Sequence, residues 1–165
     1  MSISHQILIV GGGAAGLAVA SSLYKRNSTL DIAVVEPADK HYYQPGWTMV
    51  GAGVFDKTET YRDMNAVWPT GVKRIKSAVV SFEPDQNNVI LKDDSTVGYT
   101  SLVVAPGLKL DWGAIKGLND SLGQNGVTSN YRYDLAPSTW ELVKKMDGQE
   151  AIFTQPGISK TTLGE

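Results

Sequence analysis

A cluster of glycines directly after an apolar strand pattern constrains the fold of this chain more than any other feature. Gly11, Gly13 and Gly16 fit the spacing G-x-G-x-x-G and follow the Ile- and Val-rich residues 6–10. Apolar residues near helical spacing come next, and residues 31–36 form a second buried-strand pattern. The order strand, tight turn, helix and strand predicts a βαβ unit with parallel strands and a right-handed crossover.

Each glycine of this motif has its own task in a dinucleotide site. Gly11 permits the tight turn, Gly13 lets a pyrophosphate approach the backbone, and Gly16 allows the helix to pack on the strand. Amides at the start of the helix face the phosphates. Glu36 lies 20 residues beyond Gly16, where an acid binds ribose hydroxyls and disfavours the 2′-phosphate of NADP. The alternative, a turn that binds nothing, fits this context less well, which leaves FAD or NAD.

The remainder of the chain predicts an α/β fold around this unit. Residues 37–54 form an aromatic loop interrupted by Pro and Gly. The elements expected after it are a short helix over 61–67, an antiparallel meander of three strands over 72–75, 78–82 and 88–91, a buried strand over 101–105, a helix from Pro137 and a strand over 151–154.

Three features favour FAD over NAD. The meander follows the βαβ unit, and the aromatic loop around Gln44 offers flat surfaces. The buried strand ends in Ala105-Pro106-Gly107. This ending resembles the Ala-Thr-Gly strand end of two-dinucleotide-fold flavoproteins, where the backbone passes close to the cofactor.

Composition bounds the other possibilities. The chain has 165 residues, a net charge of −2 and no cysteine. The charge gives no footprint for nucleic acid, and the missing cysteines exclude disulfides and thiolate metal sites. We expect a Rossmann-type FAD-binding domain over residues 1–150 and the start of a truncated second domain over 151–165.

A longer string carries a more specific resemblance. Residues 41–53 resemble the stretch H-x-Y-Q-P-x-W-T-x-V-G-A-G of sulfide:quinone oxidoreductases, the type found in mitochondria and many bacteria. Residues 102–112, 115–118 and 151–156 are also similar to that family. The resemblance extends from residue 5 to about residue 156, so the expected fold is the N-terminal part of a two-dinucleotide-binding-domain flavoprotein.

The resemblance implies a set of FAD contacts. Ala14 and Ala15 would lie at the pyrophosphate, Glu36 at the adenosine ribose, Gln44 beside the cofactor and Val79 at the adenine. A loop cap is the structural alternative for Gln44, and a plain core position is the alternative for Val79. With the motif residues, the expected cofactor-binding set is Gly11, Gly13, Ala14, Ala15, Gly16, Glu36, Gln44, Val79, Ala105 and Gly107.

The resemblance also implies a reaction that this chain does not complete alone. In the family, electrons pass from sulfide through a cysteine pair to FAD and then to a quinone. No cysteine is present, so we name no catalytic residue, and we name no metal site. A truncated or frame-disrupted copy of a full enzyme is favoured over a member that has lost the cysteine. Sulfide and quinone would be partners of the parent protein. The parent would bind a membrane peripherally through sequence absent here, at the bacterial cytoplasmic membrane or, in a eukaryote, at the mitochondrial inner membrane.

Several other functions compete with this interpretation. A type II NADH dehydrogenase is disfavoured by Gln155-Pro156, which replaces a second phosphate-binding turn, whereas a flavocytochrome-type sulfide dehydrogenase stays open. A non-enzymatic nucleotide-binding module or an inert fragment is the rival from another class. A small NAD-dependent dehydrogenase would need a Tyr-x-x-x-Lys pair, which is absent. A fragment of the expected kind should leave apolar surface uncovered near residues 102–112.

Overall fold

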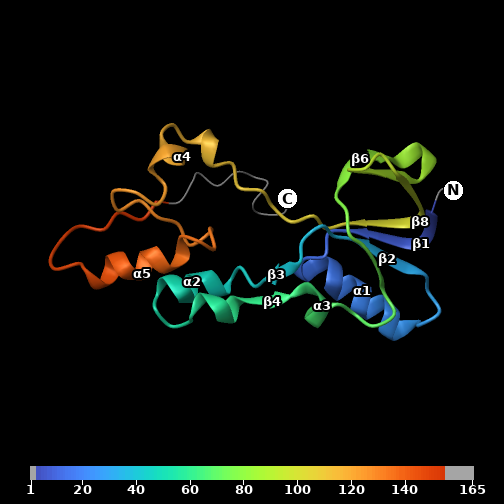
Figure 1. The fold of residues 1–165 in the computed structure, drawn as a ribbon, viewed down its shortest axis with the longest axis horizontal. Helices are drawn as coiled ribbons and strands as arrows, with labels where there is room; N and C mark the ends of the chain where they lie inside the picture. Colours follow the sequence, from blue (N-terminus) through green and yellow to red (C-terminus); the bar gives the residue numbers. More distant parts are fainter. Residues whose placement is uncertain (1–2, 155–165) are drawn as a thin grey trace.

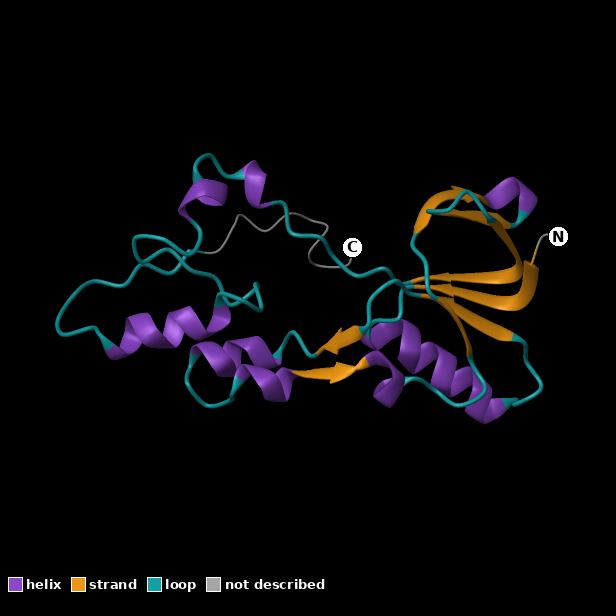
Figure 2. Ribbon diagram, in the orientation of Figure 1, coloured by secondary structure: helices purple, strands orange, loops and turns teal. Residues whose placement is uncertain are grey.

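A six-stranded sheet forms the larger lobe of the chain, whose residues 3–154 are described by a computed structural model. The strands lie in the order β5 (Lys73–Ile75), β2 (Ile32–Val35), β1 (Ile3–Val10), β8 (Thr96–Val104), β7 (Asn88–Leu91) and β6 (Val79–Glu83). The first four are parallel, whereas β7 and β6 pair in antiparallel fashion, as Figure 2 shows. The sheet is therefore mixed, with its parallel half holding the N-terminal βαβ unit.

The βαβ unit is confirmed. Helix α1 (Ala14–Arg26) connects β1 to β2, and the two strands pair in parallel from Ile7 opposite Ile32 to Val10 opposite Val35. All four residues of β2 are buried, as the continuous apolar run predicts for a strand covered on both faces.

The two faces of the sheet each carry an apolar cluster. Leu8 and Val10 belong to the cluster that includes Val89 of β7, while Ile9 belongs to the cluster that includes Ala20 of α1. Successive side chains of a strand point to opposite faces, so β1 contributes to both clusters. Figure 1 shows α1 on one side of the sheet and the β6–β7 hairpin curving over the other. A 3₁₀ turn, η2 (Pro84–Gln86), joins the strands of that hairpin.

A smaller lobe extends from the sheet (Figure 1). It contains a two-stranded antiparallel ribbon of β3 (Lys40–Tyr42) and β4 (Tyr61–Asp63). Its other elements are α2 (Gly46–Gly51), η1 (Lys57–Thr60), α3 (Met64–Val67), η3 (Trp112–Ala114), α4 (Leu118–Ser121) and α5 (Ala136–Lys144). Helix α5 packs on α2. Just after α2, a Cβ added to Gly53 would lie 2.3 Å from Cε2 of Trp140, so only glycine fits against that indole ring.

Several expected elements differ from the observed ones. The first meander strand is β5, which joins the parallel sheet, so the meander consists of β6, β7 and the first part of β8. The helix expected over 61–67 begins only at Met64, after a strand, because the Asp63 side chain caps Asn65. Residues 151–154 form no strand, and Gln155 and Pro156 lie outside the described residues.

Apolar side chains are exposed after β8, as expected. Val104, the last residue of β8, is exposed, as are Leu108 and Leu110 after it, and Leu108 retains 94% of its accessible surface. Ile115 and Phe153 add to this surface. The segment that follows the sheet is therefore not covered by the described part of the chain.

Candidate functional site

The glycine turn lies where the carboxyl ends of β1, β2 and β8 meet. Gly11 has φ +102°, and a Cβ at this position would lie 2.2 Å from the carbonyl oxygen of Ala105. The Gly11 amide donates to the Val35 oxygen at 2.9 Å, and the Ala105 amide donates to the Val10 oxygen at 2.8 Å. Gly11 is thus required by both a left-handed backbone conformation and the close passage of the β8 end.

The start of α1 is open to a ligand. Gly13 is exposed, is the residue before the first helical turn, and has no atom within 4 Å of an added Cβ. No side chain caps this helix start, and Ala14 and Ala15 are also exposed. A Cβ at Gly16 would lie 1.9 Å from the Gly11 oxygen, so Gly16 brings the helix against the turn. Uncapped amides at the N-terminus of a 13-residue helix fit a pyrophosphate.

Glu36 is joined to the glycine turn by hydrogen bonds. Its Oε2 accepts from the Gly12 amide at 2.7 Å, and its Oε1 accepts from the Ala38 amide at 2.7 Å. The side chain is half-buried. A carboxylate has about four acceptor positions, so both oxygens can still accept a ribose hydroxyl. The structure therefore brings the acid to the turn, as the motif predicts.

The end of β8 completes this edge of the sheet. Ala105 contacts Gly11, while Gly107 has φ +77°, is exposed and has open space around its Cβ position. Backbone at Gly107 is thus accessible. The structure brings Ala105 against the glycine turn, while the contacts of Ala105 and Gly107 with a cofactor stay predictions.

Gln44 and Val79 belong to elements outside the glycine turn, the segment before α2 and strand β6. Gln44 is half-buried just before α2, where its carbonyl oxygen accepts from the Trp47 amide, and it shares no hydrogen bond with the glycine turn. Val79 begins β6 and packs against the apolar cluster that contains Val10 and Val35. Their expected contacts with the cofactor stay predictions.

An aromatic cluster in the smaller lobe was not foreseen as a unit. Tyr42 faces Tyr61 across the ribbon, and Tyr133 and Trp47 complete a group whose ring centroids lie 4.9 to 6.1 Å apart. Burial, followed by the nearby Tyr61 and Tyr42, raises the pKa of Tyr133. The cluster depends on the pairing of Tyr42 with Tyr61 in the ribbon and on Tyr133, which is distant in sequence. Local sequence patterns therefore could not predict it.

A second feature missed in the sequence is the anchoring of the turn beyond Glu36. Arg74 of β5 donates to the Ala38 oxygen and to the Asn65 side chain. Asp39 accepts from Lys76, which lowers the pKa of Asp39 together with the charge of Arg74. The sequence does not indicate these contacts, because basic residues on an edge strand are normally exposed to solvent.

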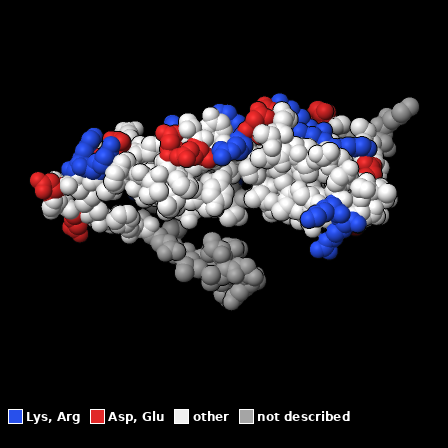
Figure 3. Space-filling view, turned by 90° about the horizontal axis from the view of Figure 1, so that it is seen from below, with Lys and Arg blue, Asp and Glu red and all other residues white. Residues whose placement is uncertain are grey.

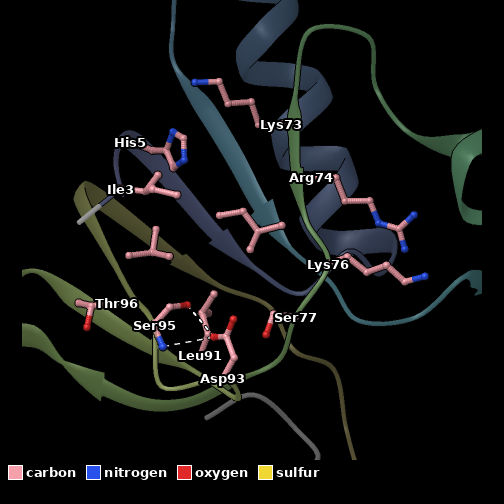
Figure 4. Close-up of a pocket in the computed structure, with 12 residues that line it drawn as sticks. Ile3, His5, Lys73, Arg74, Lys76, Ser77, Leu91, Asp93, Ser95 and Thr96 are labelled. Atoms are coloured by element: carbon pink, nitrogen blue, oxygen red, sulfur yellow. Dashed lines mark hydrogen bonds between the residues drawn. The ribbon is translucent and has the colours of Figure 1, made fainter. Parts of the chain in front are cut away.

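A cavity of the described residues lies away from the glycine turn. An open cavity of about 910 Å³ lies between the first sheet strands and the turn after β7, lined by residues such as His5, Lys73 and Asp93, and it includes no residue of the glycine turn (Figure 4). Its Lys73 is already paired with Asp31 at 2.9 Å. We therefore place the dinucleotide site at the glycine turn on its chemistry, not at this cavity.

Charge and composition of the described surface add little more. Figure 3 shows acidic and basic side chains mixed along a rim, with a broad uncharged area beside them. Within residues 3–154, no group of three or more His, Cys, Asp or Glu side chains is placed to hold a metal ion. None of the helices in this range has the length and apolar character needed to cross a membrane.

Comparison with known proteins agrees with the geometry. Residues 5–147 match the model of the pyridine nucleotide-disulphide oxidoreductase family. A mitochondrial sulfide:quinone oxidoreductase of Dictyostelium discoideum is 48% identical over 153 residues, which are 92% of this chain and 34% of that protein. The mitochondrial sulfide:quinone oxidoreductase of Mus musculus is 34% identical over 160 residues, 97% of this chain and 36% of that protein. The chain thus spans about a third of the length of these curated relatives.

A solved structure shares the fold. The sulfide:quinone oxidoreductase from the hyperthermophilic bacterium Aquifex aeolicus superposes with a TM-score of 0.68 at 21% identity, covering 86% of this chain and 32% of that one. At this identity the match supports the fold alone.

Proposed function

The chain belongs to the pyridine nucleotide-disulphide oxidoreductase family, and from this premise we propose that it is the FAD-binding region of a sulfide:quinone oxidoreductase. The observation that carries the proposal is the 48% identity to a curated protein of that name over nearly the whole chain. In the complete protein, sulfide would be oxidised and its electrons passed through FAD to a quinone.

The residues at the glycine turn fit FAD. Family members are FAD-dependent. Amides at the start of α1, at Ala14 and Ala15, would bind the pyrophosphate, and the open backbone at Gly13 would let it approach. Glu36 would accept the ribose hydroxyls while keeping its bonds to Gly12 and Ala38. Bound FAD would supply the capacity to take up and release two electrons.

Gln44 and Val79 complete the proposed site by resemblance. Gln44 would lie beside the cofactor at the entrance to α2, and Val79 would offer its backbone to the adenine. Support for Val79 is its packing against the apolar cluster that includes Val10 and Val35, the last residues of β1 and β2 before the glycine turn and Glu36. We keep the boundary proposed from the sequence, with the FAD-binding domain over residues 1–150 and a second domain beginning at 151.

The proposal places sulfur and quinone chemistry outside residues 1–165. The chain has no cysteine to form a persulfide, so this region would bind and orient FAD only. For location, the curated relatives named above are mitochondrial, which supports peripheral binding at the mitochondrial inner membrane over the bacterial alternative.

One experiment separates this proposal from its rival, a nucleotide-binding or inert fragment without redox function. The purified chain is incubated with FAD or with FMN, freed of unbound ligand, and measured by absorption spectroscopy. Because the described contacts address the adenosine diphosphate half, we expect FAD to be retained and FMN to be lost. A chain that is folded by circular dichroism but retains neither flavin would contradict the proposal.

A further inference from the structure

We propose that Arg74 is a positioning residue that holds Glu36 in place for recognition of the adenosine ribose. Arg74 makes no hydrogen bond to Glu36, and its proposed role does not require contact with the cofactor. Instead, it fixes the turn after β2, to which one Glu36 oxygen is bonded. The inference rests on the proposed function, because the ribose is the ligand that Glu36 would bind.

The Arg74 side chain is held on several sides. Its Nη2 donates to the Ala38 carbonyl oxygen and lies 3.5 Å from Oδ1 of Asp39. Its Nη1 donates to Oδ1 of Asn65 at 3.3 Å, and the guanidinium lies 5.3 Å from the centre of the Trp68 ring. Only 17% of the side chain is exposed. A planar guanidinium with several donors suits such a place better than a lysine does.

The register of the sheet explains why Arg74 reaches this turn. Arg74 lies opposite Val34 in the parallel pair, and the Glu36 amide donates to the Ile75 oxygen at 3.0 Å. Glu36 is two residues beyond Val34, so its side chain and that of Arg74 leave the same face of the sheet. Figure 4 shows the Arg74 side chain, and that of Lys76 just after β5, extending to the opposite side from Lys73 of the same strand.

A continuous series of hydrogen bonds then runs from Arg74 to the glycine turn. Arg74 donates to the Ala38 oxygen, the Ala38 amide donates to Oε1 of Glu36, and the Gly12 amide donates to Oε2 of Glu36. Bonds that involve a charged partner are the stronger ones, so both ends of the series are charge-assisted. Loss of Arg74 would release the Ala38 carbonyl and, through the backbone of Ala38, loosen the Ala38 amide that orients the Glu36 carboxylate.

Fold stability alone does not explain this arrangement. The Nε atom of Arg74 is buried and has no hydrogen-bond partner among residues 3–154. A buried, incompletely paired cation costs free energy, so a well-packed apolar residue would serve stability at least as well. The cost is consistent with a role in placing the Ala38 turn.

Lys76 provides a matched control. Its Nζ bonds to Asp39 at 2.7 Å, on the same turn, but its side chain is 58% exposed and it makes no bond to Ala38. Lys76→Gln therefore removes a neighbouring positive charge without breaking the series that leads to Glu36. Arg74→Met removes the first bond of that series, the one to the Ala38 oxygen, while keeping most of the side-chain volume.

The first test needs no ligand. In the amide NMR spectrum of the full chain, Gly12 and Ala38 protons bonded to the carboxylate should resonate downfield, and Glu36→Gln should remove this signature. We expect Arg74→Met to move both resonances toward the Glu36→Gln positions, and Lys76→Gln to leave them unchanged. Should Arg74→Met fail to fold, Arg74→Lys, which keeps the charge and loses the fork, is expected to give intermediate shifts.

The second test uses ADP and 2′,3′-dideoxy-ADP as probes in calorimetric titrations. Wild type should bind ADP about tenfold more tightly, the effect of hydrogen bonds to a charged acceptor. Arg74→Met should lower this ratio to near that of Glu36→Gln, with Lys76→Gln unchanged. The inference is overturned if Arg74→Met keeps the wild-type resonances and ratio, or if Lys76→Gln alters them equally. If the resonances respond as expected but wild type does not distinguish the two probes, the proposed ribose site is wrong, while the link from Arg74 to Glu36 stands.

Discussion

Gly13 allows binding and folding to be separated by one methyl group. Its φ of −73° and ψ of −173° are accessible to alanine, and an added Cβ would have no atom within 4 Å. Gly13→Ala should therefore fold normally and change stability by less than about 1 kcal/mol, because the gain from restricting the unfolded chain is offset by the poorer N-cap preference of alanine. For a chain of this length, the melting temperature should therefore change by less than about 4 °C.

The same methyl group should damage the cofactor site. It would project into the space through which a pyrophosphate approaches the start of α1 and would weaken charged hydrogen bonds worth about 1.5–3 kcal/mol. FAD affinity should fall about tenfold to a hundredfold, measured by quenching of flavin fluorescence alongside thermal unfolding. Gly16→Ala is the contrast, because its Cβ would collide with the Gly11 oxygen at 1.9 Å and lower stability first. Unchanged FAD affinity in a stable Gly13→Ala chain would refute the reasoning.

The remaining predictions concern the smaller lobe and the loss of stability at acidic pH. Gly53→Ala should lower the free energy of unfolding by about 2–5 kcal/mol, because of its positive φ and a collision with the Trp140 ring. Gly126→Ala has a similar φ and open space, so it should cost only the backbone strain of about 1–2 kcal/mol. Urea unfolding followed by tryptophan fluorescence measures both losses, and equal losses would count against the packing argument. A hydrogen bond from Lys73 holds the pKa of Asp31 below its usual range, so this carboxylate stabilises the fold at neutral pH and that stabilisation is lost as the pH falls below about 4. Asp31→Asn should therefore flatten the decline of the urea midpoint between pH 6 and pH 3, and an unchanged decline would contradict this assignment.

Long, strongly patterned segments of the fold could be predicted from sequence, and short ones could not. The βαβ unit follows from a continuous apolar strand, a glycine turn and helical spacing, all of which are local. The three residues of β5 carry too little pattern to specify a partner, so their pairing with β2 depends on the rest of the sheet. Helix α2 could not be predicted from the sequence, because it includes Gly46 and Gly51 and glycine usually interrupts regular structure.

The candidate site divides in a similar way. Gly11, Gly16 and Glu36 could be placed because their spacing expresses one mechanism, and the structure joins them through backbone contacts. Arg74 could not, since its contact with Ala38 spans 36 residues and depends on the register of an edge strand. Gln44 and Val79 are named by resemblance, and no contact among the described residues links them to the glycine turn.

The two amide bonds of Glu36 have a consequence for tracing how such chains evolve. Because Gly12 and Ala38 both depend on that carboxylate, selection for a folded protein alone would preserve the acid in a lineage that had stopped using a nucleotide. The open space at the Gly13 Cβ position contributes nothing to packing, so without selection for cofactor binding a substitution at Gly13 would be tolerated first. Among descendants of this chain, loss of Gly13 would therefore identify retired cofactor sites more dependably than loss of Glu36.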